Sequence, residues 1–223
     1  MNVRATIVFM ILALLYLATL PFSPYVAQFL PKALPICVLM VFAFIKLNST
    51  PRYVVLAALL FSMAGDISLA IPFEDSFITG LSCFFLAHLS YAVCFASLHC
   101  RQQRIHTDDV ISHKTKWLVS IIIVSFATLM AAHILPASKS LFYPVVAYIS
   151  VITLMGLAAV CLARTKLIIA GAMLFVVSDA ILAQSVFKTP LPSSAFWVMT
   201  TYYAAQYCLT VGLVNALLRK QTR

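Results

Sequence analysis

Residues 53–71 read YVVLAALLFSMAGDISLAI, and residues 166–187 read KLIIAGAMLFVVSDAILAQSVF. Both runs are long and apolar enough to cross a bilayer, because a membrane helix needs about 20 mostly apolar residues. Each run nevertheless contains one carboxylate, Asp66 in the first and Asp179 in the second. The chain has only 6 acidic residues among 223, so these two positions indicate a role inside the membrane.

The composition excludes an ordinary soluble domain. The chain is 63% hydrophobic and 9% charged, with a mean hydropathy of +1.04, whereas soluble domains are about half apolar and a quarter charged. The net charge of +9 does not indicate nucleic-acid binding, since the basic residues flank apolar runs. The six cysteines are scattered without metal-ligand spacing, and we predict no disulfides among them.

The apolar runs predict a fold that is all-α: a polytopic membrane protein with eight transmembrane helices in a single membrane domain. The eight spans are predicted at 5–22, 33–46, 53–71, 77–98, 117–135, 141–162, 166–187 and 195–218.

Basic residues alternate between the two ends of these spans. One side carries 12 of them: Arg4, Lys46, Arg52, Arg101, Arg104, Lys114, Lys116, Arg164, Lys166, Arg219, Lys220 and Arg223. The other side carries three: Lys32, Lys139 and Lys188. Because loops rich in Lys and Arg stay in the cytoplasm, both the N- and C-termini are predicted to be cytoplasmic.

Two pairs of segments suggest an internal repeat. GDISLA at 65–70 resembles SDAILA at 178–183, and FFLAHLSYAV at 84–93 loosely matches FWVMTTYYAA at 196–205. A duplication with four helices in each half would give a 4+4 parallel repeat. Chance similarity between apolar segments is the alternative.

The two carboxylates are expected at one depth. Asp66 lies 13 residues from Tyr53, and Asp179 lies 13 residues from Lys166, so each is about 20 Å into its helix at 1.5 Å per residue. Further polar residues from other spans reach the same layer: Lys32, His88, Tyr91, Tyr148, Tyr202, Tyr203 and Gln206.

Each of these residues also has a structural interpretation. An aspartate can hydrogen-bond a neighbouring helix, although its insertion costs about 2.5–3.5 kcal/mol and usually marks a functional site. His88 and Gln206 can simply join helices, and tyrosines are common at membrane interfaces. Lys32 can extend to the lipid headgroups, where it would also meet a phosphate.

Six motifs in their order along the chain resemble the lysoplasmalogenase-like family of membrane proteins, the YhhN type. They are PKALP at 31–35, AGDISL at 64–69, AHLSY at 87–91, PVVAYI at 144–149, GAMLFVVSDAIL at 171–182 and TTYYAAQ at 200–206. The resemblance implies a hydrolase that cleaves the vinyl-ether bond of a lysoplasmalogen, releasing a fatty aldehyde and glycerophosphoethanolamine or glycerophosphocholine. Its partners would be this lysophospholipid and membrane lipids, and we expect it in a bacterial inner membrane.

This chemistry requires an acid and an ionised group, much as glycoside hydrolysis does. We expect Asp66 and Asp179 to be the catalytic pair, sharing one proton if they lie close together. His88 and the tyrosines would orient them, and Lys32 would attract the phosphate. No cofactor and no metal is required, although a metal held by Asp66, Asp179 and His88 is a minority alternative.

Two other classes of function use similar sequences. A proton-coupled transporter also needs membrane aspartates, and a 4+4 repeat would suit it. In a scaffold or lipid-binding protein, Asp66→Asn and Asp179→Asn would either alter folding or have no effect. The sequence does not determine the oligomeric state.

Overall fold

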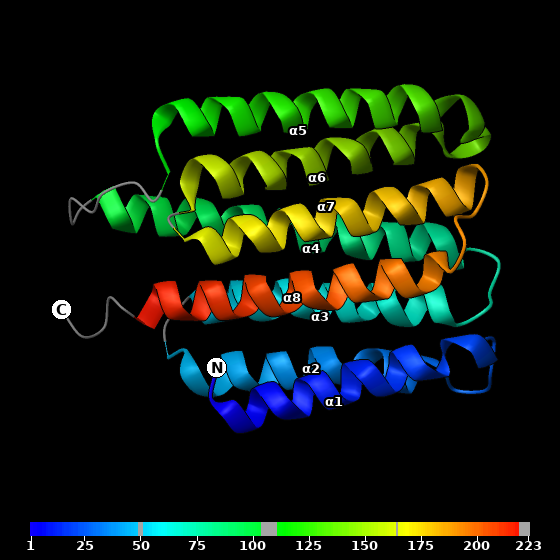
Figure 1. The fold of residues 1–223 in the computed structure, drawn as a ribbon, viewed down its shortest axis with the longest axis horizontal. Helices are drawn as coiled ribbons and strands as arrows, with labels where there is room; N and C mark the ends of the chain where they lie inside the picture. Colours follow the sequence, from blue (N-terminus) through cyan, green and yellow to red (C-terminus); the bar gives the residue numbers. More distant parts are fainter. Residues whose placement is uncertain (49–50, 104–110, 164, 219–223) are drawn as a thin grey trace.

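The structure is a computed structural model that describes residues 1–48, 51–103, 111–163 and 165–218. These ranges form a bundle of roughly antiparallel helices, shown in Figure 1. The α-helices are α1 (Val3–Thr19), α2 (Phe29–Lys46), α3 (Pro51–Ala70), α4 (Ser76–Gln103), α5 (His113–Ile134), α6 (Phe142–Leu162), α7 (Lys166–Phe187) and α8 (Ser194–Leu218). Short 3-10 turns lie at η1 (Leu20–Phe22), η2 (Leu135–Ala137) and η3 (Lys139–Leu141).

The all-helical prediction is confirmed within the described ranges. Seven helices, α1 to α7, are long and apolar enough to cross a membrane. The eighth, α8, is 25 residues long but contains several hydroxyl and amide side chains, which lower its apolarity. The structure compensates by burying these groups, since Tyr202, Tyr203, Gln206 and Thr210 are all inside the bundle.

The second helix begins earlier than predicted. The sequence places its start at residue 33, after Lys32, but α2 runs from Phe29 and contains both Pro31 and Lys32. Proline is tolerated in the first turn of a helix, where its missing N–H has no intrahelical partner to lose. Lys32 therefore lies inside the bundle, only 8% exposed, instead of extending to the headgroups.

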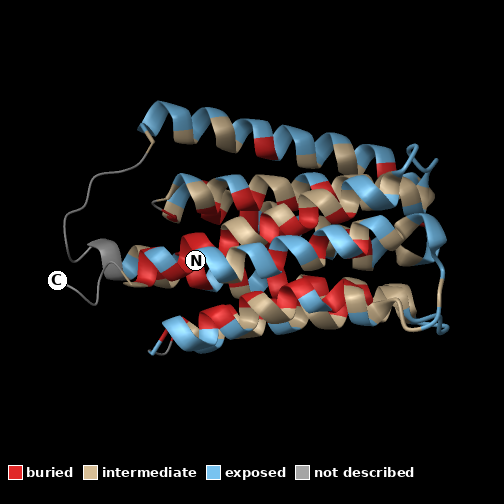
Figure 2. Ribbon diagram, turned by 60° about the horizontal axis from the view of Figure 1, so that its bottom comes forward, coloured by how far each residue is buried: buried red, intermediate tan, exposed pale blue. Residues whose placement is uncertain are grey.

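The helices pack as neighbouring pairs around α8. Extensive contacts join α3 to α4, α7 to α8 and α4 to α6, and α2 packs on both α3 and α8. The buried residues concentrate in this centre, whereas α5 forms one edge and buries only Ile123 and Ile134 (Figure 2). The N-terminus and the end of α8 lie at the same end of the bundle in Figure 1.

Gly171 permits close contact between α7 and α8. A Cβ at this position would lie 2.9 Å from the backbone nitrogen of Leu209 and 3.0 Å from the carbonyl oxygen of Ala205. Backbone atoms cannot move aside as a flexible side chain can. Gly156 in α6 differs, because a Cβ there would meet only side chains at 3.5–3.8 Å.

We expect Gly171→Ala to destabilise the protein by about 1–3 kcal/mol, the usual cost of overpacking a helix contact. Gly156→Ala is the matched control, because both changes improve helix propensity by about 1 kcal/mol and only the first creates a clash. Thermal melting in detergent should therefore show a lower melting temperature for Gly171→Ala than for Gly156→Ala. Equal melting temperatures would contradict the close packing of α7 on α8.

Candidate active site

Asp66 is held by groups from two other helices. Its Oδ1 lies 3.4 Å from Nζ of Lys32, and its Oδ2 accepts a 2.6 Å hydrogen bond from the Tyr202 hydroxyl. The Lys32 ammonium also donates to the main-chain oxygen of Asp66 at 3.2 Å. Asp66 is 2% exposed, so this carboxylate is buried with a cation and with both oxygens engaged.

Asp179 has a separate set of partners. Its Oδ2 accepts a 2.5 Å hydrogen bond from the Tyr148 hydroxyl and lies 3.1 Å from Nε2 of His88. Nε2 of His88 also lies 3.1 Å from the Tyr148 hydroxyl oxygen, so each of the three side chains contacts the other two. Within the described ranges, Oδ1 of Asp179 makes no hydrogen bond. One oxygen of this carboxylate is thus free to meet a ligand.

Aromatic rings lie between the two carboxylates. The Phe175 ring contacts His88 with centroids 4.5 Å apart and Tyr202 with centroids 5.4 Å apart. Phe84 packs edge-on against both Phe175 and Tyr202. No hydrogen bond joins Asp66 to Asp179, two residues that the structure describes fully, and each carboxylate has its own donors. A directly shared proton, which the sequence suggested for a close pair, does not fit this arrangement.

The other residues singled out from the sequence lie one layer away. Tyr203 donates a 2.8 Å hydrogen bond to the main-chain oxygen of Lys32 and so supports the Asp66 cluster. Tyr91 donates a 2.5 Å hydrogen bond to Oε1 of Gln206, and neither side chain contacts a carboxylate. Both are fully buried, which suits the helix-joining interpretation of Gln206.

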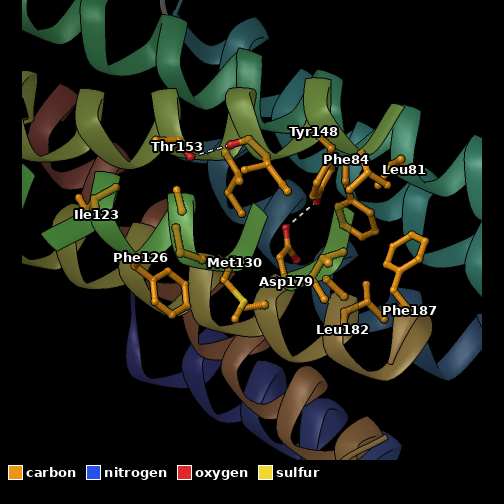
Figure 3. A pocket seen from close by; sticks show the side chains of 18 of the residues that line it. Leu81, Phe84, Ile123, Phe126, Met130, Tyr148, Thr153, Asp179, Leu182 and Phe187 are labelled. Carbon is orange, nitrogen blue, oxygen red and sulfur yellow. Dashed lines mark hydrogen bonds between the residues drawn. The ribbon is translucent and has the colours of Figure 1, made fainter. Parts of the chain in front are cut away.

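Asp179 faces a cavity on the α5 side of the bundle, which we call the side cavity (Figure 3). The space between its lining side chains is about 850 Å³, counting the part open to the outside, and a cavity of about 80 Å³ lies within it. Its walls come mainly from α4, α5, α6 and α7, and they are apolar apart from Tyr148, Thr153 and Asp179. An aliphatic chain fits such walls, and the Asp179 carboxylate is the charged group among them.

A second cavity of about 440 Å³, the end cavity, lies at the end of the bundle opposite the two termini. Its lining includes Lys32 and the polar residues Ser23, Gln28, Ser76, Ser185 and Ser194. Three side chains, Leu69, Phe77 and Leu182, line both the end cavity and the side cavity. The end cavity and the side cavity therefore adjoin at these three side chains, with Lys32 lining the first and Asp179 the second.

The sequence did not single out several of these residues. Gln28, Leu69 and Leu182 carry no motif that distinguishes them from other residues in apolar runs. A signal existed only for Gln28, which precedes Lys32 by four residues, about one helical turn. No group of three His, Cys, Asp or Glu side chains within the described ranges is arranged to hold a metal ion.

Fold and site together fit a multi-pass membrane protein with a carboxylate facing an apolar cavity. The profile of the YhhN family matches residues 27–213, and the chain belongs to this family. The match covers all the polar residues described above except Ser23.

Curated relatives share moderate identity. Human lysoplasmalogenase TMEM86B is 32% identical over 162 residues, covering 71% of this chain and 62% of the human protein. Bovine lysoplasmalogenase TMEM86A is 29% identical over 174 residues, covering 73% and 65%, and rat lysoplasmalogenase TMEM86B is 27% identical over 188 residues, covering 84% and 73%. The chain thus spans less than two thirds of the first two relatives. No solved structure matches it.

Proposed function

We propose that this protein is a membrane-embedded hydrolase that cleaves the vinyl-ether bond of a lysoplasmalogen. The products are a fatty aldehyde and glycerophosphoethanolamine or glycerophosphocholine. The observation that carries the proposal is Asp179, which Tyr148 and His88 hold against an otherwise largely apolar cavity, in a chain whose relatives are named lysoplasmalogenases.

The substrate is proposed to lie across both cavities. Its phosphate approaches Lys32, whose Nζ uses two of its three N–H groups on Asp66 and keeps one for an anion. The glycerol passes Leu69, Phe77 and Leu182, and the alkenyl chain enters the side cavity beside Asp179. This places the vinyl ether, which joins glycerol to the chain, close to the free oxygen of Asp179.

Asp179 is proposed as the proton donor. Its carboxyl proton goes to the second carbon of the alkenyl chain, and the first carbon becomes an oxocarbenium ion. Water attacks this carbon while the Asp179 carboxylate takes one of its protons, which restores the acid and gives a hemiacetal. The hemiacetal then releases its alkoxy group as an alcohol and becomes the aldehyde, so the net change is the addition of one water.

The other polar residues have supporting roles in this proposal. Tyr148 and His88 both bond Oδ2, which leaves Oδ1 of this cavity-lining residue without a hydrogen bond in the described ranges. Asp66, paired with Lys32, provides a fixed negative charge near the developing cation. We propose no cofactor and no metal in this reaction.

We also infer that the two halves of the bundle form a 4+4 repeat. Asp66 on α3 is held from α2 and α8, and Asp179 on α7 is held from α6 and α4. Counting four helices onward, and continuing from α8 to α1, converts α2, α3 and α8 into α6, α7 and α4. The proposed repeat and the distribution of basic residues together support cytoplasmic termini. We propose a bacterial inner membrane as the location of the protein.

The test is aldehyde release by purified protein in detergent from a lysoplasmalogen. The control lipid carries a saturated ether at the same position, which cannot be protonated to an oxocarbenium ion. We expect aldehyde from the first lipid only. If no aldehyde forms with folded protein, while a proton gradient drives solute flux in proteoliposomes, the transporter alternative replaces this proposal.

The side cavity offers a prediction about chain length. We expect Ala127→Phe, which adds a ring to the α5 wall of the cavity, to lower kcat/KM for a long-chain lysoplasmalogen by about tenfold and to affect a short-chain one less. Ala132→Phe is the matched control, because Ala132 is exposed on the same helix and does not line the cavity. Equal effects of the two changes would contradict chain binding in the side cavity.

A further inference from the structure

The end cavity contains a polar side chain, Gln28, that phosphate binding alone does not require. Gln28 lies in its wall at the N-cap of α2, four residues before Lys32 and with a helical backbone conformation. The Gln28 Nε2 donates to the main-chain oxygen of Ala70 at 3.4 Å, and this bond fixes the direction of the amide. Its other polar atom, Oε1, is buried without a protein partner in the described ranges. A buried acceptor of this kind calls for a donor, because leaving it unpaired costs about 1–3 kcal/mol.

The charges around the end cavity favour an anion at one position and a cation at another. Three helices, α2, α4 and α8, begin at this cavity, with Gln28, Ser76 and Ser194 at their starts. Helix N-termini and the Lys32 ammonium both attract an anion, so the phosphate belongs near them. The unpaired Gln28 oxygen prefers the opposite, a group that donates hydrogen bonds and carries positive charge.

Resting on the proposed function, we propose that the end cavity selects an ethanolamine headgroup over choline and that Gln28 is the residue that distinguishes them. The ammonium of ethanolamine has three N–H donors and can bond Oε1 of Gln28, whereas the trimethylammonium of choline has none. Side chains one helical turn apart have Cβ atoms about 5–6 Å apart, a separation that suits two charges joined by a two-carbon link. Lys32 would bind the phosphate and Gln28 the ammonium of the same headgroup.

Choline would use a different feature of the cavity. Trimethylammonium groups bind in cages of aromatic rings. Two aromatic side chains, Tyr16 and Phe77, line the end cavity, and both rings pack edge-on against other rings, Tyr203 and Phe187. The observations therefore favour recognition by hydrogen bonding.

The experiment compares ethanolamine and choline lipids in two measurements. The first is kcat/KM for the two lysoplasmalogens. The second is the rise in melting temperature caused by their saturated-ether analogues, which reports binding without turnover. We expect the parent to favour ethanolamine by about tenfold, and Gln28→Leu, which removes the acceptor together with the bond to Ala70, to bring the two headgroups within about twofold. Gln28→Glu, with an anionic acceptor, should widen the preference and provides a second test if the leucine variant is unstable.

The outcomes separate this inference from the hydrolase proposal. Binding that favours the ethanolamine analogue and depends on Gln28, without aldehyde release, would support the headgroup site and reject the hydrolase. Aldehyde release with equal use of both headgroups, or a preference unchanged in Gln28→Leu and Gln28→Glu, would overturn the role of Gln28. A preference for choline would assign the site to the aromatic rings instead. If free phosphoethanolamine stabilised the protein as well as the lipid does, the ligand would be a soluble phosphate ester and the lipid headgroup would be overturned.

Discussion

Replacing Asp179 with asparagine lowers the rate of aldehyde release by about 10²–10⁴-fold, the usual effect of losing a general acid. Asparagine keeps the shape of the side chain and can still accept a hydrogen bond from Tyr148, but it has no proton to donate to carbon. The measurement is kcat on a lysoplasmalogen, with melting temperature recorded beside it. A folded Asp179→Asn variant with parental turnover would remove Asp179 from the chemistry.

The control for this change is Asp75→Asn. Asp75 lies in the turn between α3 and α4, is exposed, and lines neither cavity. Its replacement is the same Asp-to-Asn change outside the proposed site, and we expect turnover within about twofold of the parent. Tyr148→Phe tests the orientation of Asp179 separately, because it removes one of the two bonds to Oδ2 and leaves the carboxyl in place.

The second large effect is on stability, at the Lys32–Asp66 pair. Lys32→Met leaves the Asp66 carboxylate buried without its cation, and removing one member of a buried ion pair typically costs about 3–5 kcal/mol. The double variant Lys32→Met/Asp66→Leu removes both charges, so most of the lost stability should return. Melting temperatures of the parent, the single variant and the double variant provide the comparison.

Turnover measured on the same variants shows whether the Lys32–Asp66 pair serves stability alone or also the reaction. The double variant should fold but lack turnover, because it has lost both the phosphate-binding ammonium and the negative charge of Asp66. If Lys32→Met had the melting temperature of the parent, the Lys32–Asp66 pair would contribute nothing to stability. A double variant with full activity would exclude both residues from substrate binding.

Much of the fold follows from the sequence because membrane helices are defined by apolar length. The runs at 53–71 and 166–187 became α3 and α7 with ends shifted by at most two residues. The predicted start of α2 was wrong because prolines usually interrupt helices, whereas α2 contains Pro31 in its first turn and Pro35 further along.

The site was less predictable for a physical reason. Counting residues gives the depth of Asp66 and Asp179, but it does not give the rotation of each helix or its neighbours. Packing therefore decided that Asp66 meets Lys32 and Tyr202, whereas Asp179 meets His88 and Tyr148. The same limit applies to Gln28, whose importance depends on an unpaired oxygen that only the folded chain reveals.

The central claim is that a proton reaches the alkenyl carbon and water attacks its neighbour. Hydrolysis of a lysoplasmalogen in D₂O, with the aldehyde trapped at once by borohydride reduction, tests it most directly when paired with hydrolysis in H₂¹⁸O. We predict one deuterium at the second carbon of the trapped alcohol and no ¹⁸O in the glycerophospho product. An aldehyde without that deuterium, or ¹⁸O in the glycerol hydroxyl, would contradict the proposed protonation and bond cleavage.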